Sequence, residues 1–392
     1  MKSVRDIALE GKRIFVRVDY NLPMDEHLTI TDDNRIKATL PLIDYLVDNN
    51  ARVILASHMG RPGGKTVPEL SLAPAARRLT SLLNREVAFF SNCIGKDVEE
   101  KVAALENGEV LLLENLRFHR GETENDPEFA RALAGLCDVY VNNAFAVSHR
   151  NQASVVGMVQ WVPQCAAGFL LEKELACYND SVKNPKTPLV AIIGGAKVSS
   201  KLKALKNMLN YVDTMIIGGA MANTFLKGCG IDTKGCMVEE DLGPEAAGIV
   251  ETAQRMGVTL LLPHDLVVAE KLDKDAVTRV VSVNDIPDGH MGLDIGHKTA
   301  AFFAAAVKNA GTIVWNGPMG VFEMEAFRNG TRVVAHAVAA SRGFSVVGGG
   351  DTGLAVNVCG VADQISYIST GGGAFLRLME GEELPGVAAL EK

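Results

Sequence analysis

The sequence lacks the cysteine and histidine patterns that mark common metal sites. Its seven cysteines form no C-x-x-C pair, and its eight histidines show no H-E-x-x-H spacing. A zinc site is therefore not indicated. An odd, scattered set of cysteines is typical of buried free thiols in a reducing compartment, so we expect a cytoplasmic protein.

Long hydrophobic runs are also missing. The longest uncharged stretch, residues 151–171, contains asparagine, glutamine, glycine and proline, a composition that suits a membrane helix poorly. Met1–Asp6 carries charged side chains where a secretory signal has an apolar run. We therefore expect neither a membrane span nor a secretory signal.

Positively charged residues are fewer than negatively charged ones, 39 against 47. The formal net charge of the 392 residues is −8, which argues against bulk attraction to nucleic acid or to an anionic membrane. A composition of 47% hydrophobic and 22% charged residues is typical of a globular protein, and the length suits two domains. No heptad repeat or additional helix points to assembly, so we expect a monomer.

What is present is an alternation of apolar runs with amphipathic helical stretches. Uninterrupted apolar runs are typical of parallel strands buried on both faces. The sequence thus predicts an α/β protein with two doubly wound parallel-sheet (Rossmann-like) domains joined by a helical hinge. Helical spacing is clear from Ile36 to Val47. The predicted strands are Arg13–Val18, Arg52–Ala56, Val110–Leu113 and Asp138–Val141 in the first half, and Leu189–Ile193, Thr214–Ile217, Thr312–Trp315 and Phe344–Val347 in the second.

A domain boundary is predicted near residues 182–188, where Pro185 and Pro188 stand among polar residues. Prolines end the preceding helical stretch before the next strand begins. We expect an N-terminal domain over residues 1–170, a helical hinge over 171–187 and a C-terminal domain over 188–372.

Arginine is concentrated in the first half of the chain, where residues 1–150 hold 13 of the 19 arginines but only 6 of the 20 lysines. Arg17, Arg61, Arg117 and Arg150 follow predicted strands closely, and the carboxyl ends of parallel strands bind ligands in α/β folds. Guanidinium groups match carboxylate and phosphate oxygens, so a small substrate with both groups would explain this cluster. The alternative is that arginines lie on solvated faces, which is our interpretation of Arg77, Arg78, Arg85 and Arg131.

The second half has glycine clusters after its predicted strands. Glycine lets a backbone approach a phosphate group closely, and a following helix presents free N–H groups to it. Any one cluster would also be explained by a tight turn, but four together favour phosphate binding. The clusters are Gly194-Gly195, Gly218-Gly219, Gly348-Gly349-Gly350 and Gly371-Gly372-Gly373.

Lys197 and Lys201 follow the first of these clusters. They are four residues apart, so we expect them on one face of a helix that begins there. Two cations at a helix N-terminus are unfavourable unless an anion lies beside them. The segment is not a Walker A loop, because G-x-x-x-x-G-K-[ST] is absent.

The third cluster, Gly348–Gly353, has the spacing G-x-G-x-x-G but includes Asp351. A carboxylate repels phosphate unless a divalent cation bridges the two, and Mg²⁺ is well suited to this. The alternative is that Asp351 only caps the helix that follows.

Together these segments resemble the phosphoglycerate kinase family almost from end to end. The matching blocks are residues 17–23 (RVDYNLP), 57–62 (SHMGRP), 113–118 (LENLRF), 194–199 (GGAKVS), 315–323 (WNGPMGVFE), 348–352 (GGGDT) and 369–375 (STGGGAF).

The resemblance implies which residues bind each substrate. Arg35, Lys197, Gly371 and Gly372 would be catalytic, Glu323 would contact the ribose, and Asp351 would carry Mg²⁺. The residues that would hold 3-phosphoglycerate are Asp19, Asn21, Arg35, His58, Arg61, Arg117 and Arg150. Those that would hold ADP or ATP are Gly194, Lys197, Lys201, Gly218, Asn316, Glu323, Gly348, Gly349, Gly350, Asp351 and Thr352.

The resemblance also implies a glycolytic reaction and a topology. We expect reversible, direct in-line transfer of a phosphoryl group from 1,3-bisphosphoglycerate to ADP, with Arg35 and Lys197 gripping the moving group. Because the two ligands would lie on different domains, catalysis would require hinge closure. The tail, residues 373–392, is expected to fold back onto the N-terminal domain.

Three positions depart from the pattern that many members of the family show. Asn143 and Ala146 stand where Asp and Gly are common, and Ser200 stands where Asp is frequent. These departures leave open the shape of the loop before Arg150 and of the predicted helix start near Lys201.

Two other functions remain open. A nicotinamide-dependent dehydrogenase would use the same glycine chemistry, but no suitable acidic residue follows an N-terminal G-x-G-x-x-G. A non-catalytic nucleotide- or phosphate-binding protein on the same fold would keep both sites without turnover.

Overall fold

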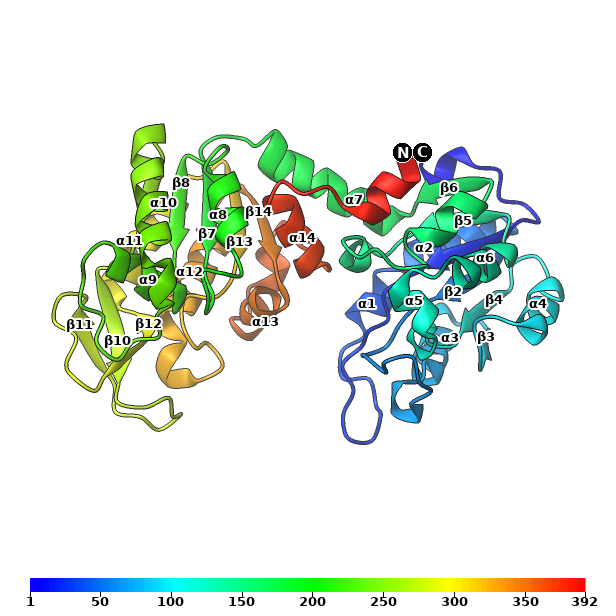
Figure 1. Ribbon diagram of the computed structural model, residues 1–392, viewed down its shortest axis with the longest axis horizontal. Coiled ribbons are helices and arrows are strands. Elements are labelled where there is room, and N and C mark those ends of the chain that lie inside the picture. The colour runs from blue at the N-terminus through cyan, green and yellow to red at the C-terminus, as the bar shows by residue number, and fades with distance from the viewer. Residues whose placement is uncertain (392) are drawn as a thin grey trace. The chain divides into compact units, whose positions relative to one another are not determined.

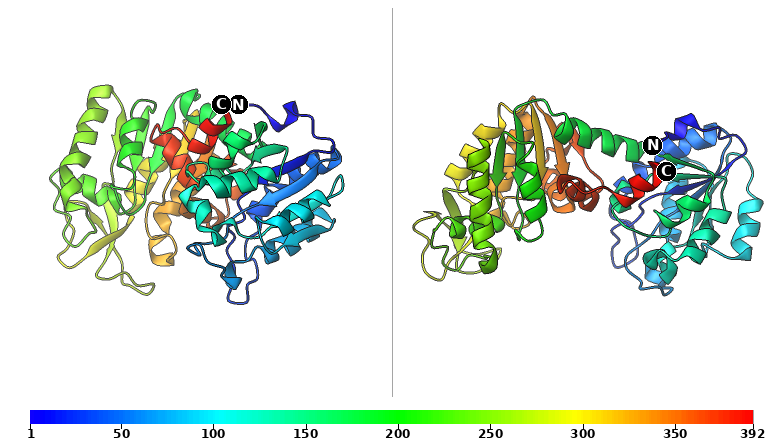
Figure 2. Two further views of the ribbon diagram at one scale, coloured as in Figure 1. Left: turned by 45° about the vertical axis from the view of Figure 1, so that its right-hand side comes forward. Right: turned by 45° about the horizontal axis from the view of Figure 1, so that its top comes forward.

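The structure is a computed structural model that describes residues 1–391, and these fold into two compact units. The first unit comprises Met1–Leu175 and the C-terminal segment from Glu383, and the second comprises Ala176–Glu382. Each is built on a six-stranded sheet whose paired strands all run parallel, with helices between successive strands (Figures 1 and 2). The predicted α/β class with two doubly wound parallel sheets is confirmed.

The first sheet has the strand order β3-β4-β2-β1-β5-β6. β1 pairs with β2 on one side and with β5 on the other, so the order reverses at β1, where such sheets bind ligands. The strands are β1 (Arg13–Arg17), β2 (Arg52–Ala56), β3 (Val87–Phe90), β4 (Val110–Leu113), β5 (Val139–Asn142) and β6 (Gln164–Ala167). The helices of this part of the chain are α1 (Asn34–Lys37), α2 (Leu40–Asp48), α3 (Ala73–Leu83), α4 (Lys96–Ala103), α5 (Arg120–Glu124), α6 (Pro127–Gly135), α7 (Phe169–Tyr178) and α15 (Pro385–Ala388).

The second unit has a parallel sheet of order β15-β14-β13-β7-β8-β9 and a separate antiparallel sheet of order β11-β10-β12. The parallel strands are β7 (Leu189–Ile193), β8 (Thr214–Ile217), β9 (Thr259–Leu261), β13 (Thr312–Asn316), β14 (Phe344–Gly348) and β15 (Tyr367–Ile368). The antiparallel strands are β10 (Asp265–Ala269), β11 (Arg279–Ser282) and β12 (Met291–Ile295). The helices are α8 (Leu202–Met208), α9 (Met221–Gly228), α10 (Gly243–Met256), α11 (His297–Val307), α12 (Asn329–Ala340), α13 (Gly350–Val358) and α14 (Gly372–Met379).

The eight predicted strands are the four inner strands of each parallel sheet, and all eight are confirmed within one residue at each end. Inner strands are covered on both faces, so β4, β5, β7 and β13 are buried at every position and read as continuous apolar runs. The sequence did not predict the edge strands β3, β6, β9 and β15 or the antiparallel sheet. Edge strands are short and partly exposed, and β11 is exposed at half of its positions.

The helical pattern from Ile36 to Val47 belongs to two helices, α1 and α2, rather than one. Between them Thr39 is almost fully buried, and its hydroxyl donates to the Ile36 carbonyl at 2.7 Å. Pro41 stands in the first turn of α2, a position that suits its missing N–H group.

One of the two unit boundaries differs from the prediction. The division after Leu175, inside α7, lies within the predicted hinge 171–187, whereas the other division follows Glu382 and not Gly372. Figure 1 shows α14 beside β14. The side-chain amide of Asn207, on α8, donates to the Met379 carbonyl at the end of α14 at 2.8 Å. Residues 373–382 therefore belong to the second unit, because the apolar face of α14 is buried there. The end of the predicted tail, Lys392, lies outside the described residues.

From Glu383 the chain joins the first unit. The Gly386 amide donates to the Ser148 carbonyl at 2.8 Å, and the two ends of the described chain come together, with Met1 and Glu391 lining one hollow (Figures 1 and 2). Within residues 1–391 we find no helix with both the length and the apolarity that crossing a membrane requires.

Candidate active site

The predicted substrate residues of the first unit gather at the carboxyl ends of four neighbouring strands. Asp19 lies just past β1 and His58 just past β2, while Arg117 lies in a short 3₁₀ turn after β4 and Arg150 lies beyond β5. These strands are adjacent in the sheet, so the fold brings together side chains that are up to 131 positions apart in the sequence.

Asp19 and Asn21 order this cluster. The Asp19 carboxylate accepts a hydrogen bond from Arg35 at 2.5 Å, and its other oxygen lies 3.7 Å from His58 Nδ1. The Asn21 side-chain oxygen accepts from the Gly60 amide at 2.9 Å, which fixes the loop before Arg61. Asp19 thus aims Arg35, whose side chain is about one-third exposed, at 36%.

Arg117 is the strongest sign that this cluster binds an anion. It is only 5% exposed, and one of its N–H groups donates to the Gly60 carbonyl at 2.8 Å. Within residues 1–391 no acceptor reaches its buried Nε and Nη2, nor the buried Nε of Arg150. Burial and the neighbouring Arg150 and Arg17 lower the pKa of Arg117 to about 10. Buried donors without acceptors are costly, so these positions suit an anionic ligand.

His58 is held in its neutral form. Burial, followed by the charges of Arg17 and three further arginines, keeps its pKa well below 6.5. Arg17 Nη2 lies 3.3 Å from His58 Nδ1, and since a guanidinium only donates, Nδ1 is the acceptor and the ring proton lies on Nε2. His58 can therefore donate one hydrogen bond to an anion without carrying a charge.

Arg17 is too deeply buried to contact a ligand and instead supports the cluster from below. It is fully buried, donates to the Ser154 hydroxyl at 2.7 Å and lies 3.8 Å from the Glu122 carboxylate. Glu122 in turn accepts from the Ser154 hydroxyl and amide at 2.6 and 2.9 Å. The sequence placed Arg17 among the strand-end arginines but gave no sign of Glu122 or Ser154, because neither follows a predicted strand.

The departures at Asn143 and Ala146 do not disturb this unit. Asn143 is fully buried, and its side-chain oxygen accepts a hydrogen bond from the Leu170 amide at 2.8 Å. Its buried Nδ2, which an aspartate would not have, finds no acceptor within residues 1–391, so this departure leaves one unpaired donor. Ala146 is not among the residues with positive φ, so the loop does not require glycine there.

In the second unit, the glycine-rich loops after the inner strands pack directly on one another. A Cβ atom on Gly194 would lie 2.1 Å from the Pro318 carbonyl oxygen, and one on Gly219 would lie 2.5 Å from the Gly195 backbone. Gly317, with a φ of +106°, would meet Gly194 at 2.2 Å. The close approach of these loops therefore requires glycine at all three positions. Sequence reasoning had explained Gly194 and Gly219 by the ligand and had not considered Gly317.

The expected helical face with Lys197 and Lys201 is wrong, because α8 begins only at Leu202. Lys201 Nζ is partly buried and donates to the carbonyls of Gly194 and Asn316 at 2.5 and 2.8 Å. Burial lowers the pKa of Lys201 to about 8, and Asp351 opposes this shift. Lys197 is exposed in the turn before α8. Lys201 thus joins the loop after β7 to the end of β13, while Lys197 is free to reach a ligand.

Glu239 holds this lysine turn from the side. Its carboxylate accepts hydrogen bonds from the Ser199 hydroxyl at 2.5 Å and the Ser199 amide at 3.0 Å, and its own amide donates to Thr224 on α9. The Ser200 hydroxyl donates to the Lys197 carbonyl at 2.8 Å, so serine at this position supports the turn. No sequence pattern pointed to Glu239.

The segment Gly348–Gly353 forms the predicted strand, turn and helix. Gly349 has a φ of +97° and precedes α13, and a Cβ on Gly350 would meet no atom within 4 Å. The Thr352 hydroxyl accepts from the Gly317 amide at 2.7 Å, and Asp351 is exposed in the first turn. No side-chain hydrogen bond caps α13, so the interpretation of Asp351 as a helix cap is wrong.

A cavity of about 350 Å³ opens beside these loops. Of the predicted nucleotide residues only Glu323 and Asp351 line it. Its apolar wall comes from the antiparallel sheet, which the sequence did not assign to the site, and from the loop after β13, of which the sequence assigned only Glu323. Gly195 and Gly219, which also line it, belong to the predicted glycine clusters. The residues that line the cavity and were missed are Ala196, Ala220, Asn223, Met237, Leu266, Leu272, Met291, Gly292, Leu293, Asp294, Ile295, Pro318, Met319, Gly320, Val321 and Phe322.

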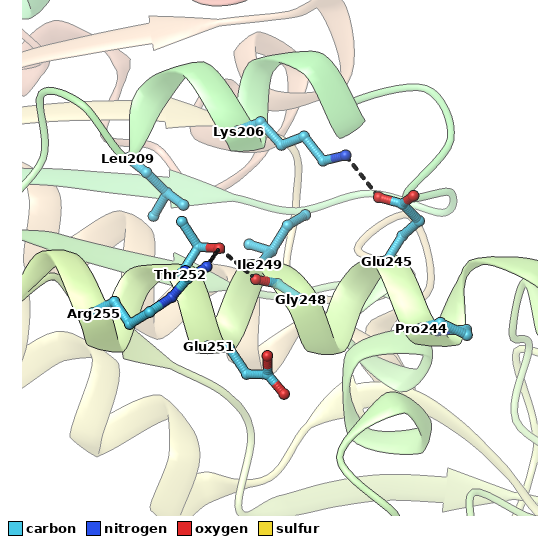
Figure 3. A pocket seen from close by; sticks show the side chains of 9 residues that line it. All are labelled: Lys206, Leu209, Pro244, Glu245, Gly248, Ile249, Glu251, Thr252 and Arg255. Carbon is cyan, nitrogen blue, oxygen red and sulfur yellow. Dashed lines mark hydrogen bonds and ion pairs between the residues drawn. The ribbon is translucent and has the colours of Figure 1, made fainter.

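A larger hollow of about 550 Å³ lies between α8 and α10 (Figure 3). It does not suit phosphate, because its cations already have partners: Lys206 lies 2.6 Å from Glu245, and Arg255 donates to Thr252 at 2.9 Å. No strand-end glycine faces it. We therefore place the candidate site of the second unit at the cavity beside β7 and β13.

Lys201 provides a pH-dependent test of that site. If phosphate groups approach it, they favour its charged form and raise its pKa above about 8. Binding of MgADP at about pH 8.5 is then expected to take up part of a proton, and binding at pH 6.5, where Lys201 is already charged, almost none. Calorimetry in two buffers of different ionisation enthalpy measures this uptake. Equal uptake by Lys201→Arg, which stays charged, would contradict the assignment.

Comparison with known proteins agrees with the family resemblance over almost the whole chain. The family described as "Phosphoglycerate kinase" matches residues 4–382. A phosphoglycerate kinase from Desulforapulum autotrophicum is 65% identical over 391 residues and covers 100% of both chains. One from Desulfosudis oleivorans is 57% identical, covering 100% of this chain and 99% of its own.

Solved structures agree with the fold. A phosphoglycerate kinase from Coxiella burnetii has a TM-score of 0.91 at 42% identity, covering 99% of this chain and 98% of its own. One from Pyrococcus horikoshii has a TM-score of 0.84 at 33% identity, covering 100% and 98%. On the fold, the strand-end sites and these similarities, the chain belongs to the phosphoglycerate kinase family.

Proposed function

We propose that the first unit binds 3-phosphoglycerate, the second binds ADP or ATP, and a phosphoryl group passes directly between the two ligands. As a member of its family the chain is a glycolytic phosphotransferase whose acceptor is a carboxyl group. The observation that carries the proposal is that two buried nitrogens of Arg117, Nε and Nη2, lack an acceptor within residues 1–391.

For the substrate, the arginines and His58 supply complementary chemistry. Arg117 and Arg150 offer their unpaired donors, the exposed Arg61 adds charge, and neutral His58 donates from Nε2. Asp19 and Asn21 orient Arg35 and the loop that carries Arg61. A molecule with a carboxylate at one end and a phosphate at the other satisfies such a cluster.

For the nucleotide, the cavity offers an apolar wall for the base and polar groups at its mouth. Glu323 is assigned to the ribose, and Lys197, Lys201 and the amides that open α13 to the phosphates. Gly350 belongs to the amides that open α13. The remaining assigned residues shape the loops around these groups; they are Gly194, Gly218, Asn316, Gly348, Gly349 and Thr352.

Asp351 fits Mg²⁺ that arrives with the nucleotide. No group of three His, Cys, Asp or Glu side chains among residues 1–391 is arranged to hold a metal alone. Mg²⁺ takes one or two carboxylates together with phosphate oxygens, which is what the single exposed carboxylate of Asp351 allows. Bound there, the ion would offset the negative charge of the phosphates.

The transfer step needs positioned cations and the exclusion of water more than a covalent partner on the enzyme. We assign Arg35 of the first unit and Lys197 of the second to the charge on the moving phosphoryl group. Gly371 and Gly372 open α14, whose first amides have no acceptor within the helix, and they are assigned to the same group. Closure of the two units around α7 would bring these residues to one phosphoryl group and exclude water.

We further propose that the enzyme works as a monomer in the cytoplasm and binds no nucleic acid. The net charge of −8 and the absence of a heptad pattern support these proposals.

The proposed function is tested by a coupled assay with 3-phosphoglycerate and ATP. Turnover is expected with Mg²⁺ present, to stop when the ion is chelated, and to return when Mg²⁺ is added back. Small-angle scattering should show a smaller radius of gyration only when both substrates are bound. Folded protein that binds both ligands without turnover would instead support the non-catalytic alternative.

A further inference from the structure

Asp294 is a buried carboxyl group that lines the nucleotide cavity. It lies on β12, is only 4% exposed, and accepts hydrogen bonds from the Gly330 amide at 2.7 Å and the Ile295 amide at 2.9 Å. Within residues 1–391 no cationic side chain forms an ion pair with it. Burial therefore raises its pKa to about 7, against the lowering effect of the two amides. Burying a carboxyl group without a cationic partner costs free energy, and groups with such shifted pKa values cluster at functional sites.

The loop between β13 and α12 packs on Asp294. A Cβ atom on Gly320, in this loop, would lie 2.3 Å from an Asp294 oxygen, and one on Gly330, in the first turn of α12, would lie 2.4 Å from it. Glycine at both positions lets two backbone segments close on one carboxyl group. Asp294 is thus the point at which β12, the loop and the start of α12 meet.

The same loop forms one wall of the cavity and carries Glu323. Its backbone is tied to β12 by the Val321 amide, which donates to the Leu293 carbonyl at 2.9 Å. On its outer side, Arg328 donates to the carbonyls of Phe322 at 2.7 Å and Glu323 at 3.2 Å. No side chain caps α12 from its own first turn, so Asp294 supplies an acceptor that the helix N-terminus otherwise lacks.

We propose that Asp294 is a positioning residue for nucleotide binding, which fixes the cavity wall that carries Glu323 by holding the start of α12. The inference rests on the proposed assignment of the cavity to the nucleotide. A carboxylate suits this place because it accepts from both amides at once. Asparagine has a single oxygen there, and its NH₂ group would face an N–H donor.

Asp265 provides a matched control in the same antiparallel sheet. It lies on β10, is 5% exposed, and accepts from the Lys298 and Thr299 amides at the start of α11, at 3.1 and 2.8 Å. A Cβ on Gly296 would lie 2.2 Å from its carboxyl carbon, so glycine packs on this group as well. Asp265 does not line the cavity. It shares the structural role of Asp294 without access to the nucleotide.

The experiment compares Asp294→Asn with Asp265→Asn in the full chain. For Asp294→Asn the Kd and KM for MgADP are expected to rise about tenfold or more, the loss typical of a hydrogen bond to a charged group. The KM for the phosphoglycerate substrate should not change, and kcat should stay within a few-fold of wild type. Asp265→Asn should lower the unfolding temperature but leave the nucleotide Kd unchanged.

Two results would overturn the inference. One is a folded Asp294→Asn variant that binds MgADP as wild type does, and the other is an equal loss of affinity in both variants. If Asp294→Asn does not fold, the test is hydrogen exchange of the wild-type protein. First-turn amides of a helix ordinarily exchange fast, so slow exchange of the Gly330 amide is expected if Asp294 holds the start of α12, and fast exchange would contradict the inference. Wild-type protein that fails to bind MgADP would instead refute the proposed function of the cavity.

Discussion

Replacement of Arg35 by alanine, or of Lys197 by alanine, is expected to lower kcat by about 10³-fold or more while both substrates still bind. Cations that stabilise a transferring phosphoryl group contribute about 10³–10⁵ in rate. Arg35 is aimed by Asp19 at 2.5 Å but stays partly exposed, and Lys197 is exposed in a turn that Glu239 fixes. Neither side chain is needed to hold its own unit together. The measurement is the coupled assay, with substrate binding followed separately by calorimetry.

Matched controls lie close to both residues. Arg78 on α3 pairs with Asp33 at 2.6 Å, beside the helix that carries Arg35, and Lys203 on α8 pairs with Glu382 at 2.9 Å. Both pairs are exposed, where ion pairs contribute little, so alanine at Arg78 or Lys203 should leave kcat within about twofold. If Arg35→Ala raised only the KM for 3-phosphoglycerate, its assigned role would be binding, not transfer.

The sequence predicted the inner strands because burial on both faces leaves an unmistakable apolar run. It could not predict β10, β11 and β12 in the same way, since an antiparallel sheet with one exposed face mixes polar and apolar residues. That sheet supplies much of the cavity wall. Arg61, Arg117 and Arg150 were accessible to sequence reasoning because they follow strands within a few residues, whereas Arg35 was assigned only through the family resemblance. Of the cavity lining, the sequence pointed only to Gly195, Gly219, Glu323 and Asp351.

Lys201 shows where reasoning from spacing fails. A separation of four residues predicts one helical face only if the helix has begun, and α8 begins one residue after Lys201. The glycines before it allow the chain to turn tightly enough for Lys201 to donate to the Gly194 carbonyl in its own loop and to the Asn316 carbonyl at the end of β13. Tertiary contacts between loops, which no local pattern encodes, decided the conformation.

Replacement of Gly194 by alanine is expected to destabilise the second unit by about 3 kcal/mol or more and to abolish nucleotide binding. The added Cβ would lie 2.1 Å from the Pro318 carbonyl oxygen and 2.6 Å from that of Gly317. Both are backbone atoms, so no rotation of a side chain relieves the contact. Urea unfolding should be followed by the fluorescence of Trp315, which is fully buried in the second unit, in a Trp161→Phe background that removes the signal of the first unit.

Gly350→Ala separates the two roles that glycine has in these loops. A Cβ on Gly350 meets no atom within 4 Å, and the residue lies in the first turn of α13. The stability of this variant should therefore equal or exceed that of wild type by about 0.5–1 kcal/mol. Its affinity for MgADP should nevertheless fall, because the methyl group would stand where phosphate approaches the helix amides.

Loss of affinity without loss of stability would assign Gly350 to the ligand and Gly194 to the contacts between loops. Unchanged affinity would mean that the phosphates bind elsewhere and that glycine serves only the packing of the loops.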